Sequence, residues 1–341
     1  MRNSSRWSRK RWPGPEPLAK PFISNLGQLQ PPFSSPTINT VQQTLADLRE
    51  QGRAASPPLD AFAPLRLWHL ASLDAPTVAV TWAIGFAWAA RVWLPAWVPA
   101  LIALTAWAVY IADRLLDARG GLRSGDMHRL RARHFFHWRH RWLLAPLAVT
   151  AAIAACAIVF VLMPPGARER NSVLAAAALA YFSGVHSGRS LPRLRFPAKE
   201  FLVAVLFTAG CALPALSRIR TAGRHSLPVW PLVALVAFFA ALAWLNCHAI
   251  ERWESRDLAP RPSHIFAAGC LLGLAGLLLA VLFAPQQPRP AALVTAGAVS
   301  ALLLALLDRR RDLLTPLALR AAADLVLLSP ALLTPLVLVA R

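Results

Sequence analysis

The stretch PAWVPALIALTAWAVYIADRLLD, residues 95–117, joins a long apolar run to two carboxylates. The run through residue 112 approaches the length of about 17–25 residues that a helix needs to cross a bilayer. Asp113 and Asp117, which follow it, are four residues apart and therefore share one face of a helix. Carboxylates are costly beside hydrocarbon and tend to be kept there for a functional reason. The pattern favours a membrane-edge site for a divalent metal ion, with a diphosphate on the far side of the metal.

The composition of the whole chain agrees with a membrane protein. Of its 341 residues, 56% are hydrophobic and only 15% are charged, whereas a soluble domain has about 25% charged residues. Further apolar runs of spanning length follow, so we expect an all-α polytopic membrane protein. We expect nine spans, at about residues 73–91, 95–113, 142–163, 172–187, 199–217, 228–249, 264–284, 291–307 and 317–340.

The net charge of +20 indicates topology rather than nucleic-acid binding. Arginines concentrate in short loops, where cations set orientation and meet anionic head groups. The loops after the even-numbered spans carry more Lys and Arg than the alternate loops. This bias predicts that these loops, the N-terminus and Asp113 and Asp117 are cytoplasmic, with a bacterial inner membrane as the expected location. Residues 1–65 are rich in proline and basic residues and predict a disordered cytoplasmic tail ahead of a transmembrane domain, 66–341.

A second polar cluster ends the sixth span. Asn246, Ile250 and Glu254 fall on one helix stripe at four-residue spacing, with Glu251 one position round. Facing carboxylates in a helical bundle are a recurrent way to hold divalent ions, so the two clusters together predict one metal site. The alternative is that these acids form solvated ion pairs with nearby arginines and simply anchor the helix ends.

The arrangement resembles the UbiA superfamily of intramembrane prenyltransferases, which has nine transmembrane helices and Asp-rich motifs after helices two and six. The first motif of that family has the form Asn-x3-Asp-x3-Asp, and the second is a similar acidic repeat. Here the first loses its asparagine, and the second loses its middle acid, for which Glu251 compensates. Tyr181 and the segment 192–200 also look like the family's connection into helix five. The motifs read Val109-x3-Asp113-x3-Asp117 and Asn246-x3-Ile250-x3-Glu254.

The resemblance implies a nine-helix UbiA-like bundle with cytoplasmic cap loops, in which Mg²⁺ bridges the acidic motifs to an isoprenyl diphosphate. It further implies transfer of the isoprenyl group to an aromatic ring or another hydrophobic lipid acceptor. The metal ligands would be Asp113, Asp117 and Glu254, and Glu251 joins these three in the implied catalytic set. The implied substrate-binding residues are Asn246, Lys199, Arg114 and Tyr181. Lys199 either binds pyrophosphate or extends to the interface.

Two other functions remain open from the sequence. A catalytically inactive UbiA-like membrane protein, serving as a lipid-binding or scaffold module, would fit the altered motifs. A secondary transporter would carry broken helices or charges at the bilayer midplane. The acids here cluster at the ends of spans instead, which argues against a transporter.

Several other polar residues admit structural interpretations. The series His134, His137 and His140 drifts around a helix and lies among aromatic residues, which favours an interfacial helix over a zinc site. Asp74 precedes Ala75-Pro76 and predicts a helix start. Arg320 and Asp324, spaced i,i+4, predict a buried ion pair.

Overall fold

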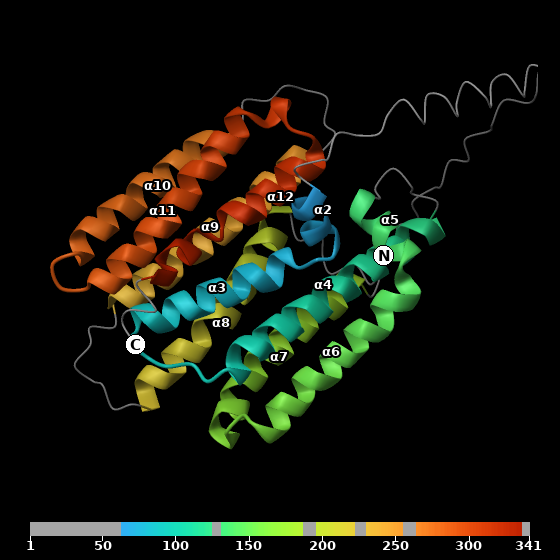
Figure 1. Ribbon diagram of the computed structural model, residues 1–341, viewed down its shortest axis with the longest axis horizontal. Helices are drawn as coiled ribbons and strands as arrows, with labels where there is room; N and C mark the ends of the chain where they lie inside the picture. Colours follow the sequence, from blue (N-terminus) through green and yellow to red (C-terminus); the bar gives the residue numbers. More distant parts are fainter. Residues whose placement is uncertain (1–62, 125–130, 187–195, 222–229, 255–263, 336–341) are drawn as a thin grey trace, which may run out of the picture. The chain divides into compact units, whose positions relative to one another are not determined.

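The computed structural model describes residues 63–124, 131–186, 196–221, 230–254 and 264–335, all within the unit Asp60–Arg341. The predicted tail, residues 1–65, lies outside these ranges except for its last three residues, which begin the first helix. The regular structure of the described ranges is entirely helical (Figure 1). Its α-helices are α2 (Ala63–Leu70), α3 (Asp74–Ala89), α4 (Trp97–Ser124), α5 (Ala132–Arg139), α6 (Arg141–Val161), α7 (Pro165–His186), α8 (Phe196–Thr221), α9 (Trp230–Glu254), α10 (His264–Phe283), α11 (Pro288–Arg309) and α12 (Pro316–Val326).

Six of the described helices are long and apolar enough to cross a membrane, namely α4, α6, α8, α9, α10 and α11. The pair α2 and α3, bent by 90° at the break between them, counts as a seventh if the two are one span. The chain therefore fits a multi-pass helical membrane protein, as its composition predicts.

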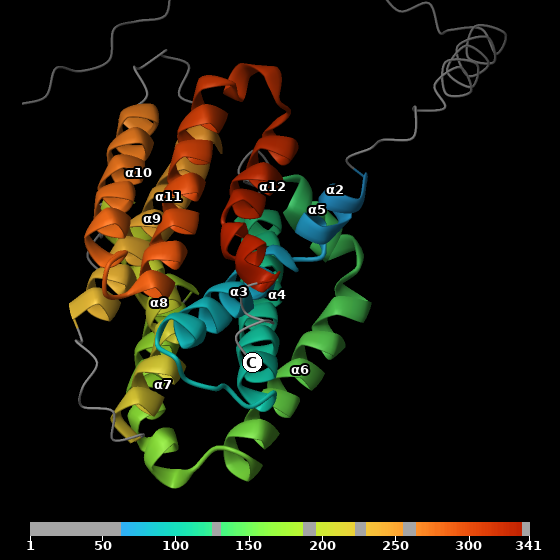
Figure 2. The same cartoon turned by 60° about the vertical axis from the view of Figure 1, so that its left-hand side comes forward.

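Large apolar side chains cover the outside of these helices. On α6, Trp142 is 82% exposed and Val161 78%, and on α10 Leu271 and Val281 are 68% and 69% exposed. Soluble proteins rarely expose contiguous apolar surface on this scale, so these faces suit lipid contact. Figures 1 and 2 place α6 and α10 at opposite edges of the bundle.

At the centre of the bundle α3 packs against α8, α11 and α12, and it reaches α9 through aromatic contact. Trp82 of α3 is fully buried and stacks on Phe239 of α9, with 3.9 Å between the ring centroids. Its indole N–H donates to the carbonyl oxygen of Leu327 at 2.8 Å, which connects α3 to the end of α12. Trp82 is thus part of the packed core.

Two predicted boundaries differ from the structure. The second span was predicted to end at residue 113, but α4 continues to Ser124, so Asp113 and Asp117 lie within the helix rather than at its end. The ninth span was predicted as one run, 317–340, but α12 ends at Val326 and a 3₁₀ turn, Ser329–Leu333, follows. Pro330 has no N–H to continue the α-helical hydrogen bonds, which explains the interruption.

Helices α10 and α11 approach closely because the buried face of α10 carries three glycines. A Cβ added to Gly269 would lie 2.8 Å from the carbonyl oxygen of Ala301 and 2.9 Å from the Cβ of Ala305. Gly273 and Gly276 continue the same buried face. Small residues at this spacing let membrane helices pack backbone to backbone.

Gly269→Val is expected to destabilise the protein by about 1–3 kcal/mol, because the added methyl groups meet the backbone of α11. The measurement is the thermal unfolding midpoint in detergent. Ala267→Val is the matched control, since Ala267 is exposed on the same helix. Equal midpoints for the two variants would contradict the close packing of α10 on α11.

Candidate functional site

Polar and charged side chains of α2, α3, α4, α5, α9 and α12 meet at one end of the bundle. There α2 and α5 lie beside each other at the end of α4 (Figure 2). Here α5 links the two predicted acidic motifs through adjacent residues. Arg133 binds Glu254, and the Nε2 of His134 lies 3.8 Å from an oxygen of Asp117. The sequence placed the two motifs at the same end of the protein, and the structure brings both to one short helix.

The first motif lies on the face of α4 near α5 and α7. Asp113 is half-buried, and the side chain of Asp117 is 48% exposed. Tyr181 of α7 is half-buried and lies within electrostatic range of both carboxylates. Arg114 is buried beside the ring of Tyr110, 5.6 Å from its centroid, and within range of Asp113.

The carboxylate of Glu254, in the second motif, is hydrogen-bonded to arginines of two other helices. Both oxygens of Glu254 accept hydrogen bonds from Arg133, at 2.6 and 3.1 Å, and Arg320 donates to one of them at 2.9 Å. The guanidinium of Arg131 also donates to the backbone carbonyl of Glu254. The sequence predicted Glu254 as a metal ligand, and a metal ion would have to displace these arginines to reach its carboxylate. The alternative interpretation, an ion pair at a helix end, describes it better, except that the pair is mostly buried.

Arg320 and Asp324 were predicted to pair with each other, but each has a different hydrogen-bond partner in the structure. Arg320 donates to Glu254, whereas Asp324 accepts from the amide of Asn246 at 3.2 Å and lies 3.7 Å from the imidazole of His69. Asn246 therefore contacts an acid of α12. This contact does not test the predicted role of Asn246 in substrate binding, which stays a prediction.

The remaining predicted residues lie at the surface of the described helices. The side chain of Glu251 on α9 is exposed, and so is that of Lys199 on α8. Next to Lys199, Glu200 pairs with His248 of α9 at 2.8 Å. The role of Glu251 as a replacement for the acid that the second motif lacks stays a prediction.

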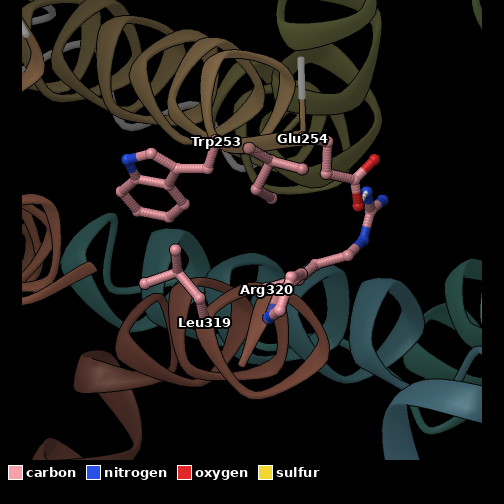
Figure 3. A pocket seen from close by; sticks show the side chains of 6 residues that line it. Trp253, Glu254, Leu319 and Arg320 are labelled. Carbon is pink, nitrogen blue, oxygen red and sulfur yellow. Dashed lines mark hydrogen bonds and ion pairs between the residues drawn. The ribbon is translucent and has the colours of Figure 1, made fainter. Parts of the chain in front are cut away.

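Figure 3 shows the pocket between α9 and α12, where Glu254 and Arg320 point toward each other. Its cavity volume of about 10 Å³ is room for about one water. A diphosphate does not fit there. The pocket is lined by Ile250, Trp253, Glu254, Pro316, Leu319 and Arg320.

A cluster that sequence reasoning did not assemble lies at the break between α2 and α3. Asp74 begins α3, as predicted, and one of its oxygens accepts from the backbone N–H of Ala75 at 2.9 Å. The other oxygen lies 2.6 Å from the Nδ1 of His69, at the end of α2. Between them, Ser72 has a φ of 54°, in the left-handed region that non-glycine residues rarely adopt. Nothing in the spacing of His69 and Asp74 connects them with Asp324, so the sequence held no signal for this group.

The histidines of α5 have separate hydrogen-bond partners, consistent with the predicted interfacial helix. The Nδ1 atom of His134 accepts from the backbone N–H of Arg131, and that of His137 donates to the carbonyl of Arg133. The Nε2 of His137 lies 3.2 Å from the hydroxyl of Ser72, so α5 also contacts the break between α2 and α3. Burial, reinforced by the charge of Arg133, lowers the pKa of His134 to about 3. His134 is therefore neutral at pH 7, with its proton on the Nε2 that faces Asp117.

Comparisons of the chain with protein-family models, with curated proteins and with solved structures gave no match. The case for a function therefore depends on the chain's own residues.

Proposed function

We propose that the protein is an integral membrane prenyltransferase of the UbiA kind, which transfers an isoprenyl group from a polyprenyl diphosphate to an aromatic or lipid acceptor. The observation that supports the proposal is the position of Asp113 and Asp117. Both lie on one face of a helix long and apolar enough to cross a membrane, near the basic helix α5. Acids in such a position suggest a binding function because their solvation is costly near lipid.

The proposal assigns Mg²⁺ to the first motif alone. Asp113 and Asp117 fit this ion, because it needs only one or two carboxylates and completes its shell with water and phosphate oxygens. Glu254 does not fit, because Arg133 and Arg320 hold its carboxylate. When bound, Mg²⁺ would offset the charge of the diphosphate.

The cations near Asp113 and Asp117 would contribute to anion binding. Arg114 is buried and lies within electrostatic range of Asp113. Arg131, whose side chain is 29% exposed, lies at the start of α5. Guanidinium groups pair well with phosphate oxygens and stabilise negative charge on a leaving group. The proposed division of work is metal binding by α4 and charge stabilisation by arginine.

The finer topology belongs to the same proposal. Nine spans would comprise the six long apolar helices, the α2–α3 pair, α7 and the segment that begins with α12. Helix α5 would act as a cytoplasmic cap over Asp113 and Asp117. The arginine bias of the loops supports a cytoplasmic N-terminus and insertion in a bacterial inner membrane.

A second candidate is a non-catalytic relative that serves as a lipid-binding or scaffold module. The observation in its favour is the second motif, whose Glu254 and Asn246 are taken up by contacts with α5 and α12. A protein that had lost the chemistry would need those residues only for stability. Binding of the diphosphate would then have no metal requirement.

Purified protein in detergent is expected to bind geranylgeranyl diphosphate in a Mg²⁺-dependent manner. Asp113→Asn/Asp117→Asn is expected to weaken binding by more than about tenfold, because it removes the metal's carboxylate ligands. The measurement is equilibrium binding with Mg²⁺ and with EDTA. Asp312→Asn is the control, since the side chain of Asp312 is 91% exposed and lies beyond α11.

Equal binding by the wild type and the double variant, with no effect of EDTA, would refute the metal site and favour the second candidate. Absence of binding by the wild type would refute the diphosphate itself as a ligand. The expected pattern is Mg²⁺-dependent binding by the wild type and by Asp312→Asn, and loss of binding in Asp113→Asn/Asp117→Asn. That pattern would justify a screen of aromatic and lipid acceptors.

A further inference from the structure

We propose that His69, Asp74 and Asp324 form a site for a divalent transition-metal ion of the zinc class, distinct from the magnesium site assigned to Asp113 and Asp117. The site is independent of the proposed transferase activity. Its residues come from three elements, α2, α3 and α12, and the last of these packs against the other two.

The ligand atoms are already gathered. One nitrogen of His69 and one oxygen from each carboxylate all lie within 4.8 Å of one another. The Nδ1 of His69 is 2.6 Å from Asp74 and 3.7 Å from Asp324. A tetrahedral zinc ion with bonds of about 2.0–2.2 Å holds its ligand atoms about 3.4 Å apart. Only small side-chain movements separate the observed arrangement from that geometry.

Neighbouring groups orient the two carboxylates toward His69. The Oδ1 of Asp74 accepts from the backbone N–H of Ala75 at 2.9 Å, and the Oδ1 of Asp324 accepts from Asn246 at 3.2 Å. The Oδ2 atom of each acid faces the Nδ1 of His69, and the two carboxyl groups also lie within hydrogen-bond distance of each other. Metal ligands are usually held in this way by a surrounding set of hydrogen bonds, which fixes the ligand direction before the ion arrives.

The charge of the group suits a dication. Asp74 is 2% exposed and the side chain of Asp324 is 16% exposed, so two acids share a poorly solvated space with one imidazole. Arg114 and Arg320 are the cations within electrostatic range of His69. Arg320 donates to Glu254 but also lies within electrostatic range of Asp74 and Asp324. Two close buried carboxylates need a shared proton or a bound cation.

Asn246 provides an independent sign of a missing ligand. Its side chain is 95% buried, and its Oδ1 has no hydrogen-bond partner, although its Nδ2 donates to Asp324. A buried carbonyl oxygen without a partner is unfavourable by about 1–3 kcal/mol. Under the proposal, a water bound to the ion would be the fourth ligand and would give this oxygen a donor.

The donor set selects the metal class. An imidazole nitrogen with two carboxylate oxygens suits Zn²⁺ and related transition metals, whereas Mg²⁺ prefers oxygen alone. The two proposed sites therefore differ in metal preference: the site of His69, Asp74 and Asp324 prefers Zn²⁺, and the site of Asp113 and Asp117 prefers Mg²⁺.

The test uses full-length, tag-free protein in detergent, stripped with EDTA and then titrated with Zn²⁺. Bound zinc is counted by mass spectrometry, and its affinity is measured against a chromophoric chelator. We expect about one zinc per chain in the wild type, in Asp312→Asn and in Asp113→Asn/Asp117→Asn. In Asp324→Asn, which keeps the size of the side chain, we expect affinity to fall by more than about tenfold. Each variant is first checked for monodisperse elution.

Failure of the wild type to bind zinc, or equal affinity in Asp324→Asn, would overturn the proposal. If Asp324→Asn does not fold, the metal ligands are instead identified by X-ray absorption on the Co²⁺-loaded wild type. X-ray absorption that shows one imidazole with carboxylate oxygens would support the site, and a spectrum without imidazole would overturn it. Because the double aspartate variant binds zinc under this proposal, loss of prenyl diphosphate binding and loss of zinc binding are separate results.

Discussion

Glu254→Gln is expected to lower the free energy of unfolding by about 3–5 kcal/mol, because it leaves two mostly buried arginines without their carboxylate. The side chains of Arg133 and Arg320 are 12% and 15% exposed, and both bind the same acid. The expected loss is larger than for a surface ion pair, whose contribution is about 0–1 kcal/mol. The measurement is unfolding in mixed micelles titrated with a denaturing detergent.

Glu251→Gln is the matched control, since it makes the same chemical change one turn earlier on the same helix at an exposed side chain. Its expected effect is within about 0.5 kcal/mol. If the two variants unfold alike while Glu254→Gln alone abolishes Mg²⁺-dependent diphosphate binding, then Glu254 is a metal ligand after all and the ion pairs are incidental. A large loss of stability supports the structural role.

Trp82→Ala is expected to cost about 3–5 kcal/mol of stability through the cavity that it leaves in the core. The indole is fully buried between α3 and α9, where it stacks on Phe239, and its N–H is bonded to Leu327. Trp82→Phe keeps most of the ring and leaves only the carbonyl unpaired, so its expected cost is smaller, about 1–3 kcal/mol. Unfolding in mixed micelles measures both.

Trp142→Ala controls for loss of an aromatic ring, because Trp142 is 82% exposed on α6. It should leave the unfolding curve nearly unchanged. If Trp82→Ala is as stable as Trp142→Ala, the packing of α3 on α9 is looser than described.

Run length and hydropathy are sufficient to locate most of the helices, because a spanning helix must be continuously apolar. They fail at Asp113 and Asp117, which the sequence placed at the end of a span. Hydropathy falls there, but Arg114, Leu115 and Leu116 are good helix formers, and the next glycine along the chain is Gly120. Helix α4 therefore continues after the apolar pattern has stopped.

The candidate site was only partly predictable for a different reason. Spacing arguments identify residues that share a helix face, such as Asp113 with Asp117, but they carry no information on partners from distant segments. Glu254 pairs with Arg133 and Arg320, which are 121 and 66 positions away. Its four-residue distance from Ile250 suggested a metal motif, whereas tertiary packing gave it two arginines.

Because the break between α2 and α3 shortens the straight part of this segment, α3 alone is shorter than a typical hydrocarbon layer. Helix α3 has 16 residues, which at 1.5 Å per residue extend about 24 Å, less than the roughly 30 Å of a typical hydrocarbon layer. Hydrophobic mismatch of this kind is relieved by local thinning of the bilayer or by polar groups that reach toward the head groups. Lipids with long acyl chains would bring hydrocarbon to the level of the break, where packing within the protein keeps Ser72 and Asp74 only 1% and 2% exposed.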